Sequence, residues 1–208
     1  MISDKLELIF IHIPKCGGSS IEQIFWSKEE RVESNLWMGF IDKYHNKFQT
    51  GGLQHLKATQ IRLSVGDEKF KAYLKFSVVR NPYDRAVSQY IYMQSRPDLR
   101  DFVGMKKNDS FIDYLYKINH KSHVQWESQF SFLHDNNGEC LADLIVKLEG
   151  INVLPSLLKS YPLIPAFDAV PKVNSNPLYD KKKYLSNEAK SLIMDKYSLD
   201  FKTFNYPH

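Results

Sequence analysis

The chain has little cysteine and no apolar segment long enough to span a bilayer. Its 208 residues include only 2 cysteines, Cys16 and Cys140, which are too few for a disulfide framework. The N-terminal stretch MISDKLE lacks a basic region, and the apolar run after it is too short to cross a membrane. These absences predict a soluble protein of a reducing compartment.

Internal repeats, low-complexity tracts and a strong charge of either sign are also missing. The net charge is +4, and 43% of the residues are hydrophobic. The apolar fraction is enough to build a core, so the composition argues against a disordered chain. Mild basicity suits an anionic ligand but falls short of a dedicated nucleic-acid binder, so no nucleic-acid partner is expected.

A magnesium-nucleotide loop is absent in its usual form. The stretch IPKCGGSS (13–20) joins the apolar run 8–13, a buried strand, to a helical segment that ends near residue 27. Strand, glycine turn and helix form the layout of a phosphate-binding loop. However, the lysine precedes the glycines, and no Lys-Ser or Lys-Thr follows them, so the pattern G-x-x-x-x-G-K-[ST] is not matched.

What this loop does contain still favours an anion. Gly17 and Gly18 let the backbone approach a ligand closely, and the following helix N-terminus offers unpaired N–H groups. Ser19 and Ser20 add hydroxyl donors, and Lys15 brings a positive charge. A purely structural glycine turn is the alternative interpretation.

A second junction of the same kind follows the strand predicted over 73–79. Asn81 is suited to cap a helix and Pro82 to occupy its first position, so a helix is expected through residue 93. Arg80, at the strand end, and Ser88, in the second turn of the helix, can hold one phosphate. In the alternative interpretation, Arg80 pairs with Asp84 and Ser88 has no role.

The remaining pattern alternates between strands and helices. It predicts helices over 55–63, 110–116, 152–158 and from Ser186 onward, a strand over 141–148, and loops over 28–54 and 162–177. We therefore expect a single α/β domain over 1–208, three-layered and P-loop-like, with a mainly parallel central sheet flanked by helices. Both junctions should lie at the carboxyl edge of that sheet.

Together the two motifs resemble a known family. IPKCGGSS resembles the loop that binds the 5′-phosphosulfate group in PAPS-dependent sulfotransferases, and VVRNPYDRAVSQY (78–90) resembles their 3′-phosphate motif. SQFSFL (128–133) through LIVKLE, and the tail from VNS (173–175) to DFKTFNY, are similar to the carbohydrate-type branch, family 2. Residues 28–50 and 95–125 are left as variable insertions on the acceptor side.

The resemblance implies a co-substrate and the residues that hold it. PAPS (3′-phosphoadenosine 5′-phosphosulfate) would be the sulfuryl donor and PAP the product, with no metal. Lys15 would bridge the sulfuryl group and the leaving phosphate oxygen. Lys172 stands where a histidine is more usual in the family. The expected cofactor-binding residues are Pro14, Lys15, Cys16, Gly17, Gly18, Ser19, Ser20, Arg80, Ser88, Lys172 and Asn174.

His55 is the candidate catalytic base, because a histidine has a pKa suited to neutral pH and related enzymes carry a histidine or carboxylate in this region. The alternative is a surface histidine that caps a short helix. The acceptor is expected to be a carbohydrate hydroxyl, with a phenol or a protein tyrosine as alternatives. Cys16 is interpreted as a small loop residue rather than a redox-active thiol.

Two rival functions stay open at the level of sequence. One is a P-loop nucleotide kinase or NTPase, and the other is a non-catalytic nucleotide- or glycan-binding module. Related animal enzymes carry a membrane anchor and work in the Golgi lumen. The lack of an anchor here predicts a cytoplasmic enzyme of bacterial or viral type, unless the chain is a trimmed form of a Golgi-lumenal enzyme.

Overall fold

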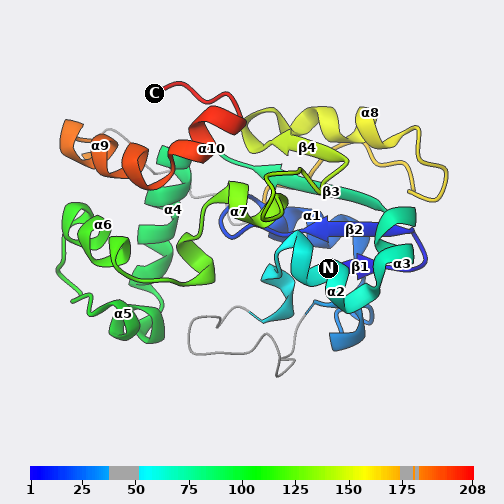
Figure 1. Ribbon diagram of the computed structural model, residues 1–208, viewed down its shortest axis with the longest axis horizontal. Helices are drawn as coiled ribbons and strands as arrows, with labels where there is room; N and C mark the ends of the chain where they lie inside the picture. The colour runs from blue at the N-terminus through cyan, green and yellow to red at the C-terminus, as the bar shows by residue number, and fades with distance from the viewer. Residues whose placement is uncertain (38–51, 174–179, 181–182) are drawn as a thin grey trace.

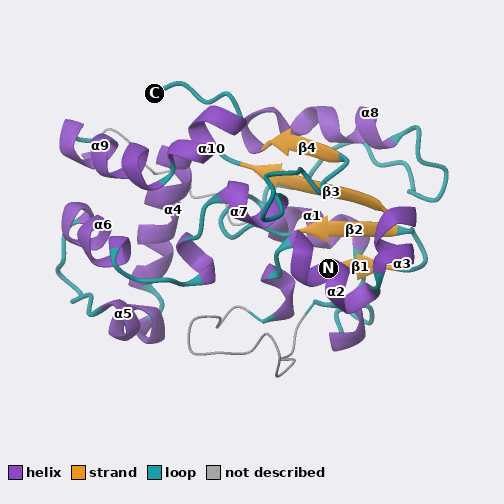
Figure 2. Cartoon of the chain, viewed as in Figure 1, coloured by secondary structure: helices purple, strands orange, loops and turns teal. Residues whose placement is uncertain are grey.

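A four-stranded sheet forms the centre of the molecule (Figures 1 and 2). The computed structural model describes residues 1–37, 52–173, 180 and 183–208. The strands are β1 (Ile2–Ser3), β2 (Leu8–Ile11), β3 (Leu74–Val79) and β4 (Leu144–Lys147), in the order β1-β2-β3-β4. β1 pairs antiparallel with β2, whereas β2–β3 and β3–β4 are parallel. Parallel strands buried on both faces read as continuous apolar runs, which explains why β2 and β3 stood out in the sequence.

Helices cover both faces of this sheet, and alternate residues of β2 show how. Leu8 and Phe10 belong to a buried cluster with α1 (Gly18–Phe25) and α8 (Leu154–Leu158). Ile9 and Ile11 belong to the other cluster, shared with α2 (Ala58–Val65), α3 (Asp67–Ala72) and α7 (Gln129–Leu133). The described chain is thus a mixed α/β structure with its sheet flanked by helices.

A second group of helices lies beyond the carboxyl ends of the strands, on the left in Figure 1. It contains α4, α5, α6 and α9, and α10 continues from α9 toward the sheet. Their bounds are α4 (Pro82–Gln94), α5 (Pro97–Val103), α6 (Phe111–Asn119), α9 (Asn187–Lys196) and α10 (Ser198–Thr203). Four 3-10 turns complete the described elements: η1 (Glu33–Asn35), η2 (Leu53–His55), η3 (Val124–Trp126) and η4 (Leu148–Val153).

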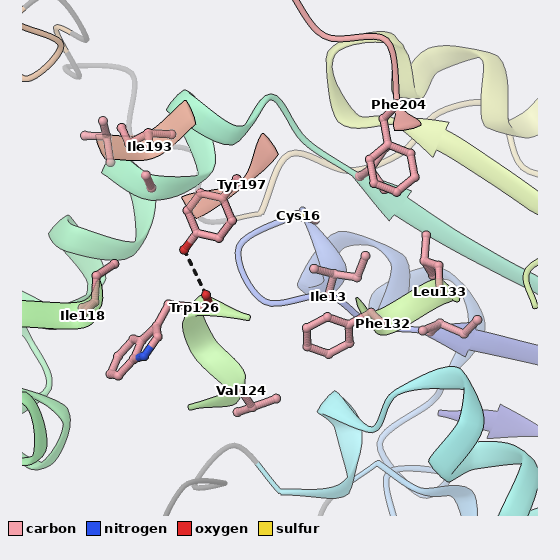
Figure 3. Close-up of a cluster of buried hydrophobic side chains, with 14 of the residues drawn as sticks. Ile13, Cys16, Ile118, Val124, Trp126, Phe132, Leu133, Ile193, Tyr197 and Phe204 are labelled. Carbon is pink, nitrogen blue, oxygen red and sulfur yellow. Dashed lines mark hydrogen bonds between the residues drawn. The ribbon is translucent and has the colours of Figure 1, made fainter. Parts of the chain in front are cut away.

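The larger cluster joins distant parts of the chain. Figure 3 shows Ile13 and Cys16 drawn with Phe132 of α7 among the buried side chains. In the same view the hydroxyl of Tyr197 donates a hydrogen bond of 3.0 Å to the carbonyl of Trp126. The loop after β2 therefore rests on the same core as the C-terminal helices.

Several elements predicted from sequence are confirmed with adjusted ends. The strands expected over 8–13, 73–79 and 141–148 are present but shorter, as β2, β3 and β4. The second junction is confirmed in detail: Asn81 accepts a hydrogen bond of 2.9 Å from the Tyr83 N–H and caps α4, with proline in its first turn. The helices expected over 110–116 and after Ser186 are α6 and α9, each capped by the preceding serine.

The helix predicted over 55–63 is wrong at its start. The chain is extended at Leu56 and Lys57, and α2 begins only at Ala58. His55 therefore lies in the 3-10 turn η2. The helix predicted over 152–158 is confirmed as α8, which begins at Leu154, directly after the 3-10 turn η4 ends.

The sequence patterns also missed β1, α3, α5, α7 and α10. Positions 38–51 and 174–177, in the two predicted loops, lie outside the described residues. Within the described ranges, no helix combines the length and apolar character needed to cross a membrane.

Candidate anion-binding site

The loop after β2 has an unusual backbone. Gly17 adopts φ 82° and caps α1, and Lys15 also has a positive φ, 67°. A side chain at Gly17 would be strained, and its Cβ would lie 2.7 Å from a methyl carbon of Leu148. The Ser20 N–H donates to the Gly17 carbonyl at 3.1 Å. The N–H groups of Gly18 and Ser19, before it, have no acceptor within the helix, and the helix dipole places partial positive charge there. This end of α1 can therefore receive an anion through its backbone.

Gly18 has a different and steric reason to be glycine. A Cβ at this position would lie 1.8 Å from Nε2 of His12, inside the imidazole ring. The ring of His12 therefore packs directly on the backbone of α1. The expected contact of Gly18 with an anion concerns its N–H group, and that contact stays a prediction.

His12 and Glu22 form a buried polar cluster that the sequence analysis missed. Nδ1 of His12 lies 3.2 Å from Oε1 of Glu22, and both side chains are buried. Burial raises the pKa of Glu22, but the contact with His12, the charge of His12 and the charges of Arg31 and the N-terminus together hold that pKa below the ordinary value. The ring centroid of His12 is 4.5 Å from that of His55. The available signal was the histidine that directly follows the β2 run.

His55 is not a surface residue, so the alternative of an exposed helix cap is wrong. Its side chain is buried, and Nδ1 lies 3.1 Å from the carbonyl oxygen of His12. A carbonyl only accepts, so Nδ1 carries the hydrogen and Nε2 is left as the basic nitrogen. Burial, and then the charge of His12, hold the pKa of His55 well below its ordinary value, so the imidazole is neutral at pH 7.

The two predicted junctions are in direct contact. Nη1 of Arg80 donates a hydrogen bond of 3.2 Å to the carbonyl oxygen of Lys15. Ser88 is half-buried on α4, two turns after the strand end. The structure thus brings Lys15 and Arg80 together at the carboxyl edge of β2 and β3.

Arg85 reinforces this junction and was also missed. It is buried on α4, and its guanidinium donates to the carbonyls of Pro14, at 3.0 Å, and Glu127, at 2.7 Å. One side chain therefore fixes the β2 loop, α4 and the segment before α7. In the sequence, Arg85 simply follows Asp84 on a predicted helix, and that pattern does not indicate hydrogen bonds to distant carbonyls.

Gln129 links the two junctions a second time. Its Oε1 accepts from the Arg80 N–H at 2.8 Å and lies 3.3 Å from Sγ of Cys16, and its Nε2 donates to the Arg80 carbonyl at 2.8 Å. The side chain is fully buried. Both junctions therefore contact Gln129, the first residue of α7.

Cys16 faces this buried network. Its exposed fraction is 1%, and burial raises the pKa of the thiol to about 12. The thiol is therefore protonated at neutral pH and can donate to Gln129, which agrees with a structural loop residue. Any contact of Cys16 with a ligand would use its backbone.

Two of the remaining predicted contact residues, Ser19 and Ser20, lie in the first turn of α1. Ser19 is half-buried. The hydroxyl of Ser20 accepts a hydrogen bond of 3.2 Å from the Val173 N–H, so the late loop does reach the β2 loop. Lys172 is exposed, and Asn174 lies outside the described residues. Among the described residues, no three His, Cys, Asp or Glu side chains are grouped as a metal site requires.

Lys15 is half-buried, and its ammonium sits among other cations. Burial, and then the charge of Arg80, lower its pKa from 10.5 to about 8. Most Lys15 side chains are still charged at pH 7. An anion placed at this loop would remove the repulsion and raise the pKa again.

The chain matches a known protein family and a curated relative. A model of the sulfotransferase family matches residues 1–207. The chain is 22% identical over 251 aligned positions to carbohydrate sulfotransferase 10 of Xenopus laevis, an alignment that covers 99% of this chain and 66% of the relative. The chain thus spans just under two thirds of that relative's length. No solved structure matches it.

Proposed function

Because the chain belongs to the sulfotransferase family, in its carbohydrate-type branch, we propose that it transfers a sulfuryl group from PAPS to an acceptor hydroxyl. The observation that carries this proposal is the hydrogen bond between Arg80 and the Lys15 carbonyl. A nucleotide with anionic groups at both its 5′ and 3′ positions needs two adjacent cationic corners, and these residues supply them.

Each corner has its own task in this proposal. The N–H groups at the start of α1, with the hydroxyls of Ser19 and Ser20, bind the 5′-phosphosulfate. Arg80 and Ser88 bind the 3′-phosphate, the group that distinguishes PAPS from ATP. The nucleotide is also contacted by backbone atoms of Pro14, Cys16, Gly17 and Gly18. From the late loop it is contacted by Lys172 and Asn174.

Lys15 stabilises the charge that develops during transfer. The S–O bond to the 5′-phosphate breaks as a new S–O bond to the acceptor oxygen forms, and the phosphate of PAP takes the electron pair. The ammonium neutralises that leaving oxygen, which needs no proton transfer. In-line positioning and charge stabilisation supply most of the rate in closely analogous phosphoryl transfer.

His55 accepts the proton that the acceptor hydroxyl loses. Its bond to the His12 carbonyl leaves Nε2 as the acceptor atom, and its neutral state at pH 7 is the state a base requires. A base with a very low pKa is a weak one. When the substrate is bound, the negative charge of the nearby nucleotide would raise the pKa of His55 toward 7.

The same family supports the proposed fold and acceptor. We assign residues 1–208 to one three-layer, P-loop-like sulfotransferase domain, because helices cover both faces of the sheet and the loop after β2 meets α1 at an anion-ready end. A carbohydrate hydroxyl is the proposed acceptor. It is supported by the name of the relative, a carbohydrate sulfotransferase.

The test is sulfuryl transfer from labelled PAPS to a panel of carbohydrate acceptors. We expect Lys15→Ala to lose nearly all transfer while it still binds PAP, because the lysine acts mainly on the developing charge. Arg80→Ala should lose transfer chiefly through weaker PAPS binding, by about 10-fold or more, as expected for a charged hydrogen bond of about 1.5–3 kcal/mol. His55→Ala should bind PAP normally and transfer slowly. Arg62→Ala is the matched control, because Arg62 of α2 pairs with Asp67 and with neither junction.

Three results would contradict the proposal. Arg80→Ala that binds PAPS as tightly as the parent removes the 3′-phosphate assignment. Magnesium-dependent ATP turnover would favour a kinase or NTPase, whereas PAP binding without transfer to any acceptor would favour a binding module.

A further inference from the structure

The ammonium of Lys15 lies over the aromatic ring of Tyr92. Nζ of Lys15 lies 4.3 Å from the centroid of that ring. This distance is well inside the range of about 6 Å in which a cation over an aromatic face is attracted. Tyr92 lies one helical turn after Ser88 on α4, so the two residues share a face of the helix.

The ring itself is held in place. Nη1 of Arg96 hydrogen-bonds the Tyr92 hydroxyl, and the guanidinium carbon lies 5.3 Å from the ring centroid. Arg96 in turn pairs with Asp98 through two hydrogen bonds, of 2.9 and 2.6 Å. Such a two-pronged pair has a fixed geometry. The ring under Lys15 is thus anchored at its hydroxyl end.

Lys15 needs such support because its surroundings oppose it. Its backbone has a positive φ, which is unfavourable for a residue with a side chain, so the loop dictates where the side chain starts. The titratable groups that act on its ammonium are Arg80, whose charge lowers its pKa, and the neutral thiol of Cys16, and Arg96 lies across the Tyr92 ring. Arg80 repels the ammonium, whereas the negative ring face attracts it.

We propose that Tyr92 is a positioning residue for sulfuryl transfer, which holds the Lys15 ammonium in place over its ring. The ring also favours the charged form of the lysine, whose pKa burial and Arg80 lower to about 8. The inference rests on the proposed function only for its kinetic part. The positioning of Lys15 can be measured without turnover.

The first experiment measures the pKa of Lys15 without substrate, from the pH dependence of its labelling by an amine-reactive reagent, read by peptide mass spectrometry. Tyr92→Leu removes the ring, and Tyr92→Phe keeps it. Losing a cation–π contact should lower the pKa by about 0.4–1.5 units in Tyr92→Leu, a 2- to 30-fold change. Tyr92→Phe should titrate like the parent. Equal pKa values in all three proteins would overturn the proposal, whether or not the protein transfers sulfate.

The second experiment measures kcat and KM for PAPS against pH. In Tyr92→Leu, kcat should fall about 2- to 30-fold with little change in KM, and its alkaline limb should shift to lower pH because Lys15 loses its proton earlier. Tyr90→Leu is the matched control, since Tyr90 is half-buried on the same helix and bonds Asp109 instead. A loss in kcat that Tyr90→Leu reproduces would mean that Tyr92 acts only through stability.

A further set of variants keeps the test sharp if Tyr92→Leu does not fold. Fluorinated phenylalanines at position 92 preserve the shape of the ring and progressively weaken its negative face. The Lys15 pKa should fall stepwise with fluorine number. An unchanged pKa across this series would refute the cation–π contact.

Discussion

At the scale of single residues, glycine and histidine at the site are coupled. Gly18 is required because the imidazole of His12 occupies the place of its Cβ. The ring of His12 then contacts Glu22 and lies against His55, the proposed base. The lack of a Cβ at Gly18 therefore leaves room for the His12 ring and for its buried contacts with Glu22 and His55.

Gly18→Ala should therefore destabilise the protein by about 1–3 kcal/mol, the usual cost of overpacking a tight core. The measurement is chemical denaturation followed by circular dichroism. Gly150→Ala, where a Cβ would meet nothing within 4 Å, is the control and should change stability by less than about 0.5 kcal/mol.

A double variant decides whether His12 is the cause. Gly18→Ala should cost less in a His12→Ala background, because the ring that clashes is gone. Equal costs in both backgrounds would show that the strain comes from another neighbour.

At the level of secondary-structure elements, α7 connects the loop after β2 to the end of β3. Its N-terminus is fixed by Asp200, whose carboxylate accepts from the N–H groups of Gln129, at 2.9 Å, and Phe130, at 2.8 Å. Gln129 then holds Arg80 and Cys16 through its amide. The position of a short helix thus sets the distance between the proposed 5′ and 3′ sites.

Gln129→Met should keep the volume but leave the Arg80 N–H and carbonyl without this partner. We expect a stability loss of about 1–3 kcal/mol for each deprived group, and weaker PAP binding measured by calorimetry below the melting temperature. Ser128→Ala removes the serine cap of the same helix, at a cost of about 0.5–2 kcal/mol, and serves as the control. PAP affinity equal to that of the control would show that Gln129 supports folding alone.

At the scale of the whole molecule, the C-terminal helices support a site built near the N-terminus. Asp200 of α10 is fully buried, and desolvation raises its pKa above the ordinary 3.8, although Arg85 and the two N–H donors oppose this. The ionised carboxylate is therefore a cost to folding at pH 7. The folded state binds the proton more tightly than the unfolded state does.

Asp200→Asn should reveal this cost through the pH dependence of stability. Between the folded pKa and 3.8, the parent gains stability relative to the variant as the pH falls, because the folded state takes up the proton first. Denaturation midpoints at several pH values test this. Asp67→Asn is the control with the opposite sign, because Arg62 lowers the pKa of Asp67. A parent that loses stability relative to Asp200→Asn on acidification would contradict the assignment.

The local features of this protein follow from short stretches of its sequence. The apolar runs defined β2 and β3, and Asn81 with Pro82 defined the start of α4, because capping and burial act over a few residues. The glycines, Lys15, Arg80 and Ser88 could be identified as anion-site candidates for the same reason. The family resemblance could be stated from these motifs and is confirmed by the match over residues 1–207.

The contacts between those features arise only from tertiary packing. The contact of Arg80 with Lys15, the amide of Gln129, the guanidinium of Arg85 and the ring of Tyr92 all join residues that are distant in sequence. The burial of His55 likewise depends on His12, 43 residues away. No local pattern records such contacts, because they arise only when the strands and helices pack together and enclose polar groups that must find partners.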